Sequence, residues 1–431
     1  MFKKIVRFVL EHKVKRYFKK HSPQLVVVVG SVGKTSTKTA IATVLSERLR
    51  VRAHEGNHND VMSVPLALLG VDYPGQVHSV KEWLKVFAAM NLRIKEEKDV
   101  DVIVQELGTD HPGEIPTFGR YLKPDIAVVT AVSDEHMEFF GNLDAVAREE
   151  LSVAAYSKTT VINRDDVSGK YADFAKTTSV DTYGLSEPAE YRLSVEPASP
   201  VDGRIGKLFT PEWGELPITL QLVGDHSLKA AAAAACVAAK LGLTSAETTL
   251  GIGKILPTKG RMQVLRGLKE TVLIDDTYNS SPLAAAAALK TLYETPAPQR
   301  IAILGSMNEL GSTSAQAHEK IGQLCDPLKL EWVVTIGDEA AKYLAPAAAK
   351  KGCQVKSFKT PYQAGGFVHG VMMPGAVVLA KGSQNGVFAE EAIKVLLRDA
   401  DDEARLVRQT AYWLDVKSEQ FSAFSAEEVD D

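Results

Sequence analysis

The sequence predicts an α/β protein with two domains, each built on a mostly parallel sheet. Continuous apolar runs rich in β-branched residues alternate with stretches of helical periodicity, and this alternation restarts near residue 256. Helices cover both faces of a parallel sheet, so its strands are typically apolar throughout. With 431 residues, 45% of them hydrophobic, the chain can form two cores.

Residues 1–22 are expected to form a basic amphipathic helix. The sequence MFKKIVRFVLEHKVKRYFKK combines an apolar stripe at helical spacing with eight lysines and arginines. The stripe consists of Phe2, Ile5, Val6, Val9, Val14, Tyr17 and Phe18. Such a helix either docks on its own domain or contacts a membrane surface or an anionic ligand through residues 1–20, and the sequence leaves these alternatives open.

Residues 23–255 are predicted to form a central ATPase-like domain. Strands are expected in the runs LVVVV, DVIVQEL, PDIAVVTAV and TTVIN, with an antiparallel addition between residues 187 and 222. The alanine-rich stretch HSLKAAAAAACVAAKLGL predicts a helix that ends at a glycine.

Residues 256–400 are predicted to form a second, Rossmann-like α/β domain. Its strands are expected in TVLIDD, RIAILG, EWVVTIG and AVVLAKG, and the Gly/Pro-rich boundary before them is the expected hinge. Residues 401–431 are expected to form a helix, DEARLVRQTAYWLDVKSEQF, with Trp413 packed, and then an acidic tail.

Composition excludes several classes of protein. A formal net charge of −4 gives no reason to expect a nucleic-acid partner. Cys236, Cys325 and Cys353 are far apart and odd in number, which favours a reducing compartment over a disulfide scaffold. No apolar run approaches the roughly 18 residues of a membrane span, and the N-terminus lacks the pattern of a signal peptide. We expect a cytoplasmic monomer.

The stretch LVVVVGSVGKTSTK predicts a phosphate-binding P-loop between a strand and a helix. Its glycines let backbone amides approach an anion, and the helix N-terminus adds its dipole. Lys34 is expected to reach the β and γ phosphates of a nucleotide, and the Thr35 hydroxyl to hold Mg²⁺. Val28 replaces the first glycine of the longer P-loop spacing, so the match is to a shorter Gly-x-x-Gly-Lys-Thr form. The nucleotide-binding candidates are Gly30, Ser31, Gly33, Lys34, Thr35 and Ser36.

Further polar residues follow later strands of the same domain. Glu106 ends DVIVQEL, His136 follows PDIAVVTAV, and Glu149 and Glu150 lie in the helical stretch LDAVAREELSV. In an open α/β sheet the chemistry lies outside the carboxyl ends of the strands. A lysine, a threonine, carboxylates and a histidine at that edge predict ATP bound with one or two Mg²⁺ ions.

Nine segments in order resemble the Mur ligase family of ATP-dependent amide-forming enzymes, most closely its branch that adds D-alanyl-D-alanine. They are GSVGKTSTK, GNHNDVMSVPLALL, ELGTDHPGEI, EHMEFFGNLDAVA, LVGDHSLKAAAAAA, KGRMQV, IDDTYNSSPLAAAAAL, ILGSMNELGSTSAQAHEKIG and AKGSQNG.

The resemblance implies that ATP phosphorylates a carboxylate and that an amine attacks the acyl phosphate. By position, Thr35 and Glu106 would serve one Mg²⁺ ion and His136 a second. Arg261 would contact the ATP phosphates and Asp276 the ribose. Lys34, His136, Asn279 and Lys381 would be catalytic. The residues alone leave Asp276 open between a metal or ribose ligand and a helix cap.

Three departures from the family stand out. Glu150 occupies the position of a carbamylated lysine, so its carboxylate would either replace the carbamate as a catalytic, metal-facing group or be a solvated helix residue. Ser227 and Ala230 replace two asparagines that help hold adenine. Only 23 residues precede Gln24, where this branch has a UDP-binding domain, and a single helix cannot replace that domain.

We therefore expect a Mg-ATP-dependent ligase that adds a dipeptide such as D-Ala-D-Ala to a carboxylate of a peptidoglycan precursor. One alternative is the same chemistry on a non-murein acceptor of the poly-amino-acid or folate type. A second alternative is a degenerate module that binds nucleotide without catalysis.

Overall fold

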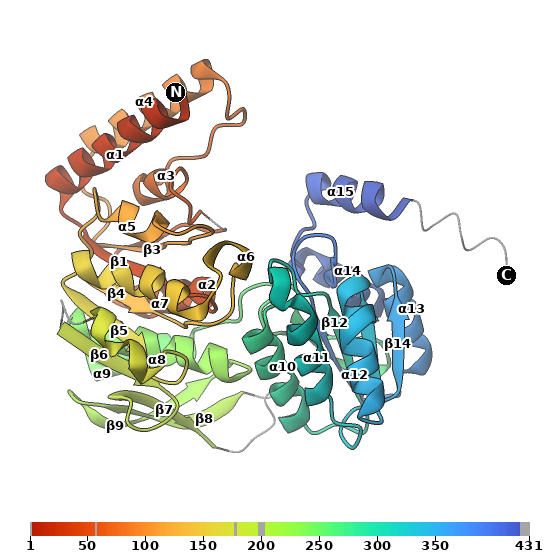
Figure 1. Cartoon of the computed structure of the whole chain (residues 1–431). Helices are drawn as coiled ribbons and strands as arrows, with labels where there is room; N and C mark the ends of the chain where they lie inside the picture. Colours follow the sequence, from red (N-terminus) through yellow and green to blue (C-terminus); the bar gives the residue numbers. More distant parts are fainter. Residues whose placement is uncertain (1, 57, 176–178, 197–202, 423–431) are drawn as a thin grey trace.

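A nine-stranded sheet organises the first domain (Figure 1). The structure is a computed structural model that describes residues 2–56, 58–175, 179–196 and 203–422. Strand pairs from β2 to β7 are parallel, whereas β7, β8 and β9 pair antiparallel. The spatial order is β2 (Val51–Ala53), β3 (Val102–Glu106), β1 (Gln24–Val29), β4 (Ile126–Val129), β5 (Thr159–Asn163), β6 (Ser179–Gly184), β7 (Tyr191–Val195), β8 (Arg204–Thr210) and β9 (Gly214–Leu220).

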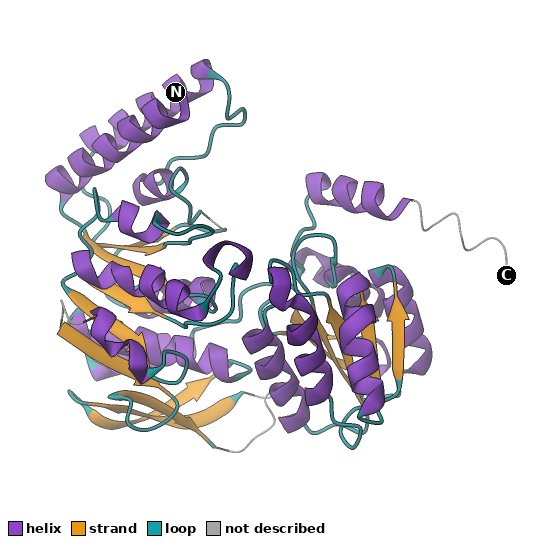
Figure 2. Ribbon diagram, viewed as in Figure 1, coloured by secondary structure: helices purple, strands orange, loops and turns teal. Residues whose placement is uncertain are grey.

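Strand β1 shows why the sheet carries helices on both faces. Leu25, Val27 and Val29 enter one hydrophobic core, while Val26 and Val28 enter the other. The first core is covered by α1 (Phe2–His21), α3 (Val64–Leu69), α4 (Val80–Lys95), α5 (Glu114–Phe118) and α7 (Leu143–Leu151). The second is covered by α2 (Lys34–Leu45), α8 (Asp225–Lys240) and α9 (Ser245–Gly253). The short helix α6 (Met137–Phe140) lies toward the second domain (Figures 1 and 2).

A six-stranded sheet forms the second domain, and only β10 is antiparallel to its neighbour. Its order is β10 (Gln263–Arg266), β11 (Val272–Asp276), β15 (Val377–Lys381), β12 (Arg300–Gly305), β13 (Trp332–Ile336) and β14 (Val355–Phe358). Helices α10 (Pro282–Glu294), α11 (Ser314–Leu324) and α12 (Ala345–Lys350) cover one face. Helices α13 (Pro361–Val371) and α14 (Glu390–Leu396) cover the other, and α15 (Ala411–Phe421) follows.

The predicted α/β class with mostly parallel sheets is confirmed, and every run expected to be a strand is one. The antiparallel addition is present as β7, β8 and β9, and α8 is followed by Gly242 in the left-handed region. The sequence did not predict β2, β6, β10 and β14, which are short or lack a continuous apolar run. All three cysteines are buried thiols.

Helix α1 packs against α3 and α4, as the docking alternative predicts. Its predicted apolar stripe is wrong in part, because Leu10 and Lys13 are buried whereas Phe2 and Ile5 are exposed. Lys13 tolerates burial because its ammonium donates to Asn91 Oδ1 over 2.6 Å.

The predicted C-terminal helix also differs from the structure. A 3₁₀ turn spans Ala400–Arg405, and α15 begins only at Ala411. Arg408 interrupts the helix because its backbone φ of 54° is left-handed. Trp413 is half-buried and makes an edge contact with Phe388. The predicted acidic tail lies outside the described residues.

Candidate nucleotide and ligation site

The P-loop connects β1 to α2 as the sequence predicts. Gly30 has φ 122°, and a Cβ atom there would lie 2.3 Å from Thr130 Oγ1, so only glycine fits. Gly33, with φ 89°, caps α2 without a side-chain hydrogen bond. The first turn of α2 therefore directs free backbone amides and the positive end of its dipole toward the cavity.

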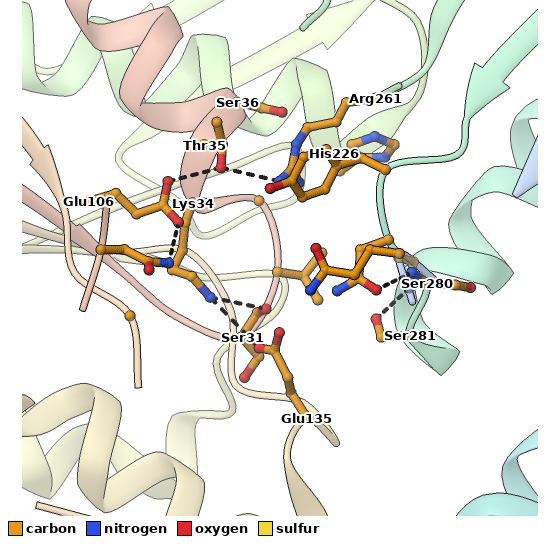
Figure 3. Close-up of a pocket in the computed structure, with 18 of the residues that line it drawn as sticks. Ser31, Lys34, Thr35, Ser36, Glu106, Glu135, His226, Arg261, Ser280 and Ser281 are labelled. Carbon is orange, nitrogen blue, oxygen red and sulfur yellow. Dashed lines mark hydrogen bonds and ion pairs between the residues drawn. The ribbon is translucent and has the colours of Figure 1, made fainter. Parts of the chain in front are cut away.

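Lys34 lies at the base of this loop (Figure 3). Its ammonium donates to the carbonyls of Gly30 (2.6 Å) and Ser31 (3.4 Å) and lies 3.7 Å from Glu135 Oε2. Burial lowers the pKa of Lys34, but Glu135 and other nearby carboxylates outweigh burial and raise it overall. Lys34 is therefore a fixed positive charge at the phosphate loop.

Thr35 and Glu106 form a hydrogen-bonded pair beside Lys34. The Thr35 hydroxyl donates to Glu106 Oε2 over 2.8 Å, and Glu106 Oε1 accepts from Asn59 Nδ2 over 3.1 Å. Hydroxyl and carboxylate oxygens are the ligands that Mg²⁺ prefers. The donor set at the start of α2 thus fits a magnesium ion that shares its remaining ligands with phosphate and water.

The second domain supplies the opposite wall. Arg261 Nη2 donates to Thr35 Oγ1 over 3.1 Å, which joins the two domains directly, and its guanidinium stacks 4.3 Å from the ring centre of Tyr278. The register of β11 and β15 places Asp276 opposite Lys381. Their buried side chains form an ion pair of 2.6 Å, and Lys381 also donates to the carbonyl of Asn279 over 3.0 Å.

His136 forms a second contact between the domains. It caps α6 with φ 51°, and its Nδ1 lies 3.0 Å from Glu309 Oε2, while its Nε2 lies 3.5 Å from Asp110 and 3.8 Å from Glu135. Burial lowers the pKa of His136, but the hydrogen bond to Glu309 and the nearby acids raise it overall. The histidine therefore carries charge more readily here than in water.

These residues surround one cavity of about 240 Å³ between the domains (Figure 3). Of the predicted site residues, it is lined by Ser31, Gly33, Lys34, Thr35, Ser36, Glu106, His136, Arg261, Asp276, Asn279 and Lys381. Gly30 lies behind the lining, where its carbonyl orients Lys34. Residues as far apart in the chain as Thr35 and Arg261 thus build a single site.

Glu150, like Gly30, lies outside the cavity lining. It is buried behind the loop, where its Oε2 accepts from the backbone amide of Gly30 over 2.8 Å, and it does not line the cavity. Here the carboxylate holds the backbone of the phosphate loop and acts electrostatically on Lys34. Its predicted contact with Mg²⁺ stays a prediction. Burial raises the pKa of its carboxyl to about 7.

Sequence reasoning missed several wall residues: Asn59, Asp110, Glu135, His226, Tyr278 and Glu309. Asn59, Asp110, Glu135 and Glu309 lie in loops that no periodic pattern identifies. The only feature of the sequence that could have identified these six residues is that each lies in one of the nine segments that resemble the family.

A second cavity, of about 260 Å³, adjoins the P-loop. Val32, Gly33 and the start of α8 line it, together with an ion pair of 2.8 Å between Lys229 and Asp166. His226 lines both cavities, and its Nδ1 is buried without a hydrogen-bond partner among the described residues. Ser227 and Ala230, which replace the family asparagines, are buried in the fold.

Profiles of two domains match the chain. The Mur ligase middle domain matches residues 28–238, and the Mur ligase glutamate ligase domain matches residues 260–384. The chain belongs to the Mur ligase family. The resemblance predicted from the sequence is confirmed, and with it the ligase class of enzyme.

Curated relatives carry the name UDP-N-acetylmuramoyl-tripeptide–D-alanyl-D-alanine ligase. The protein of Bacillus subtilis is 25% identical over 79% of this chain and 68% of its own length. That of Synechocystis is 27% identical over 87% of this chain and 75% of its own length.

Solved structures share the fold. MurF ligase from Thermotoga maritima in complex with ADP has a TM-score of 0.76 at 23% identity, covering 92% of this chain and 84% of the other. MurF from Acinetobacter baumannii has a TM-score of 0.76 at 23% identity, covering 91% and 81%. Within the described part of this chain, none of the helices has the length and apolarity needed to cross a membrane.

Proposed function

We propose that this Mur ligase uses ATP to join D-alanyl-D-alanine to the carboxylate of a peptidoglycan precursor, UDP-N-acetylmuramoyl-tripeptide. The observation that carries the proposal is the shared cavity, in which the P-loop and the Thr35–Glu106 pair of one domain face Arg261 and Lys381 of the other. The names of the curated relatives support the choice of both substrates.

The chemistry requires two displacements. A carboxylate oxygen of the precursor attacks the γ phosphorus of ATP, the bond to ADP breaks, and an acyl phosphate forms. The amine of the dipeptide then attacks the carbonyl carbon, loses a proton, and expels phosphate from the tetrahedral intermediate as the amide forms. Both displacements need aligned reactants and fixed positive charge in a shielded site.

Residues of the first domain would hold the triphosphate. The amides at the start of α2 and the Lys34 ammonium would bind the β and γ phosphates. Thr35 and Glu106 would hold Mg²⁺, which when bound neutralises phosphate charge. Among the described residues no group of three or more His, Cys, Asp or Glu side chains is suited to hold a metal by itself. Phosphate and water would therefore complete the shell.

Residues of the second domain would bind the reacting end. Arg261 would move from the Thr35 hydroxyl to a phosphate oxygen. Lys381, held in place by Asp276, would stabilise negative charge on the acyl phosphate. Asn279 would add hydrogen bonds to the same group. His136 would hold the side chain of Glu135 in place at the cavity wall. The second Mg²⁺ ion beside His136 and the ribose contact of Asp276 stay predictions. The cytoplasmic location and the monomeric state also stay predictions.

The base of ATP would occupy the second cavity. This cavity begins at Gly33 of the P-loop, so a nucleotide with its phosphates on the loop would reach it. The Lys229–Asp166 pair offers a donor and an acceptor at its wall, and the unpartnered Nδ1 of His226 offers a further polar atom. These groups would take over the role of the asparagines absent at Ser227 and Ala230.

The proposal is tested by incubating the protein with Mg-ATP, UDP-N-acetylmuramoyl-tripeptide and D-Ala-D-Ala. We expect phosphate release that requires both substrates and a pentapeptide product in the mass spectrum. Lys34→Ala should abolish both signals, while Lys350→Ala, at an exposed position in the second domain, should leave them unchanged.

Two outcomes contradict the proposal. Phosphate release only with folate-type or poly-amino-acid acceptors would show the same chemistry on another substrate. Release that never exceeds the Lys34→Ala background with any acceptor would show a nucleotide-binding module without ligase activity.

A further inference from the structure

Helix α1 presents an outward face that its own domain does not cover. Val6, Leu10, Val14 and Tyr17 point into the core, so the opposite side of the helix faces solvent. That side starts with two large apolar residues, Ile5 and Phe8, and Phe8 is 71% exposed. Folding therefore leaves apolar side chains in water at the beginning of the helix.

The rest of this outward face is basic. Helical spacing places Lys4, Lys15, Arg16 and Lys19 on the side of Ile5 and Phe8, and all four are exposed. Among the described residues, none of the four forms an ion pair with an acidic side chain. Residues 2–21 contain eight lysines and arginines and a single acid, Glu11, whereas the whole chain has more acidic than basic residues.

Helix α4 extends the same kind of surface. It packs along α1 at the outer end of the first domain (Figure 1). Val80, Leu84 and Leu92 recur at multiples of four and are exposed, Leu84 and Leu92 each to 61%. The exposed lysines Lys81 and Lys85 flank this stripe. Two adjacent helices thus both expose apolar residues beside basic ones.

We propose that the outward faces of α1 and α4 dock on the surface of a bilayer that contains anionic phospholipids. Apolar side chains at the boundary between headgroups and acyl chains, beside lysines near anionic headgroups, are the two attractions that hold amphipathic helices on membranes. Docking would leave the catalytic cavity unchanged, because the residues that line this cavity lie outside α1 and α4.

Other partners fit this surface less well. A second copy of the chain would place the basic face of α1 against itself, where like charges repel. A nucleic acid would pair with the lysines but leave Ile5, Phe8 and Leu84 in water. An anionic bilayer matches both the charge and the exposed apolar residues.

The test is sedimentation of the full-length protein with vesicles. Vesicles of phosphatidylcholine mixed with phosphatidylglycerol, whose anionic headgroups give a negative surface potential, are compared with vesicles of phosphatidylcholine alone. We expect binding to the anionic vesicles that weakens as salt is raised. The double variants Ile5→Ser/Phe8→Ser and Lys15→Glu/Lys19→Glu should each weaken binding by about tenfold or more.

Matched controls lie in the second domain. Lys350→Glu/Lys351→Glu makes the same charge change at exposed lysines, and Leu328→Ser removes an apolar side chain that is 92% exposed. Both controls should bind vesicles like the parent. All variants should melt like the parent and release phosphate at the parent rate in solution, which separates a loss of docking from misfolding.

Three results would overturn the inference. The first is no binding to anionic vesicles at low salt. The second is binding that the α1 variants leave intact, which would place the contact elsewhere. The third is a dimer in sedimentation velocity that Ile5→Ser/Phe8→Ser dissociates, which would make a second copy the occupant.

Discussion

Replacing Glu150 by glutamine should change how the stability of the first domain depends on pH. The Glu150 carboxyl is 2% exposed, accepts from the amide of Gly30, and lies behind the phosphate loop. Glutamine has nearly the same shape and keeps an oxygen that can accept from this amide. The substitution therefore removes the titrating group with little change in packing.

The sign of the effect follows from the direction of the pKa shift. Burial raises the pKa of Glu150 from 4.5 to about 7. The folded protein then binds a proton at this site more tightly than the unfolded chain, and the proton stabilises the fold fully below pH 4.5. This contribution is lost as the pH rises through about 7, and it amounts to about 2 to 3 kcal/mol between pH 5 and pH 8.

Urea unfolding of the parent and of Glu150→Gln at pH 5 and pH 8 measures this contribution. The parent should lose about 2 to 3 kcal/mol more of its free energy of unfolding than the variant between the two pH values. If the free energies of unfolding of parent and variant differ by the same amount at both pH values, the difference reports instead the weaker hydrogen bond to Gly30. Glu149→Gln is the matched control, since Glu149 is also buried and accepts from the amides of Gly113 and Ile115.

Equal pH dependence in the parent and in Glu150→Gln would refute the argument, because another group would then be titrating. The same variant also tests the metal-facing role that the sequence suggests. A carboxylate behind the loop predicts that the Mg²⁺ concentration for half-maximal activity stays the same. A rise in that concentration would place Glu150 at the metal after all.

Three further substitutions test the cavity walls. Glu106→Gln should raise the Mg²⁺ concentration required for phosphate release by about tenfold or more, because an amide is a weaker ligand than a carboxylate; titration with MgCl₂ measures it. Asp276→Asn leaves the Lys381 ammonium buried without its counterion and should cost about 3 kcal/mol in urea unfolding, whereas the double variant Asp276→Asn/Lys381→Met should recover part of this loss. Glu309→Gln should lower the pKa of His136, because it removes the negative charge that favours the protonated ring, and NMR titration of the ring should show a downfield limit reached only at lower pH. An unchanged His136 titration would exclude the contact between the domains.

Local patterns explain how much of the fold the sequence predicts. The run LVVVV is apolar on both faces, and the structure divides its side chains between two cores. The Gly-x-x-Gly-Lys-Thr spacing likewise fixes a strand, a turn and a helix start, because Gly30 and Gly33 need backbone conformations that other residues avoid. The strand and the turn are determined by residues that are adjacent in the chain, and for this reason the sequence alone predicts them.

Features that depend on tertiary contacts were not predictable in the same way. Val9 and Leu10 fit two different helical stripes in α1, and only packing on α3 and α4 selects the one with Leu10 buried. Glu309 follows a strand of the second domain, and nothing in its neighbourhood indicates that it meets His136 of the first. Glu150 meets the amide of Gly30, 120 residues earlier in the chain, and no local pattern indicates this contact.

The Thr35 hydroxyl explains why both domains are needed for the proposed chemistry. The hydroxyl donates its proton to Glu106 while its oxygen accepts from Arg261, so one group joins the metal side of the site to the second domain. A nucleotide phosphate seated on the P-loop would lie between Thr35 and Arg261, and the guanidinium would then bind phosphate, its stronger partner. Binding of nucleotide would thus replace a direct contact between the domains by one through phosphate. The free energy of association of the two domains would then depend on the phosphate. Loss of the γ phosphate would weaken this association at the stage of the reaction when the products must leave.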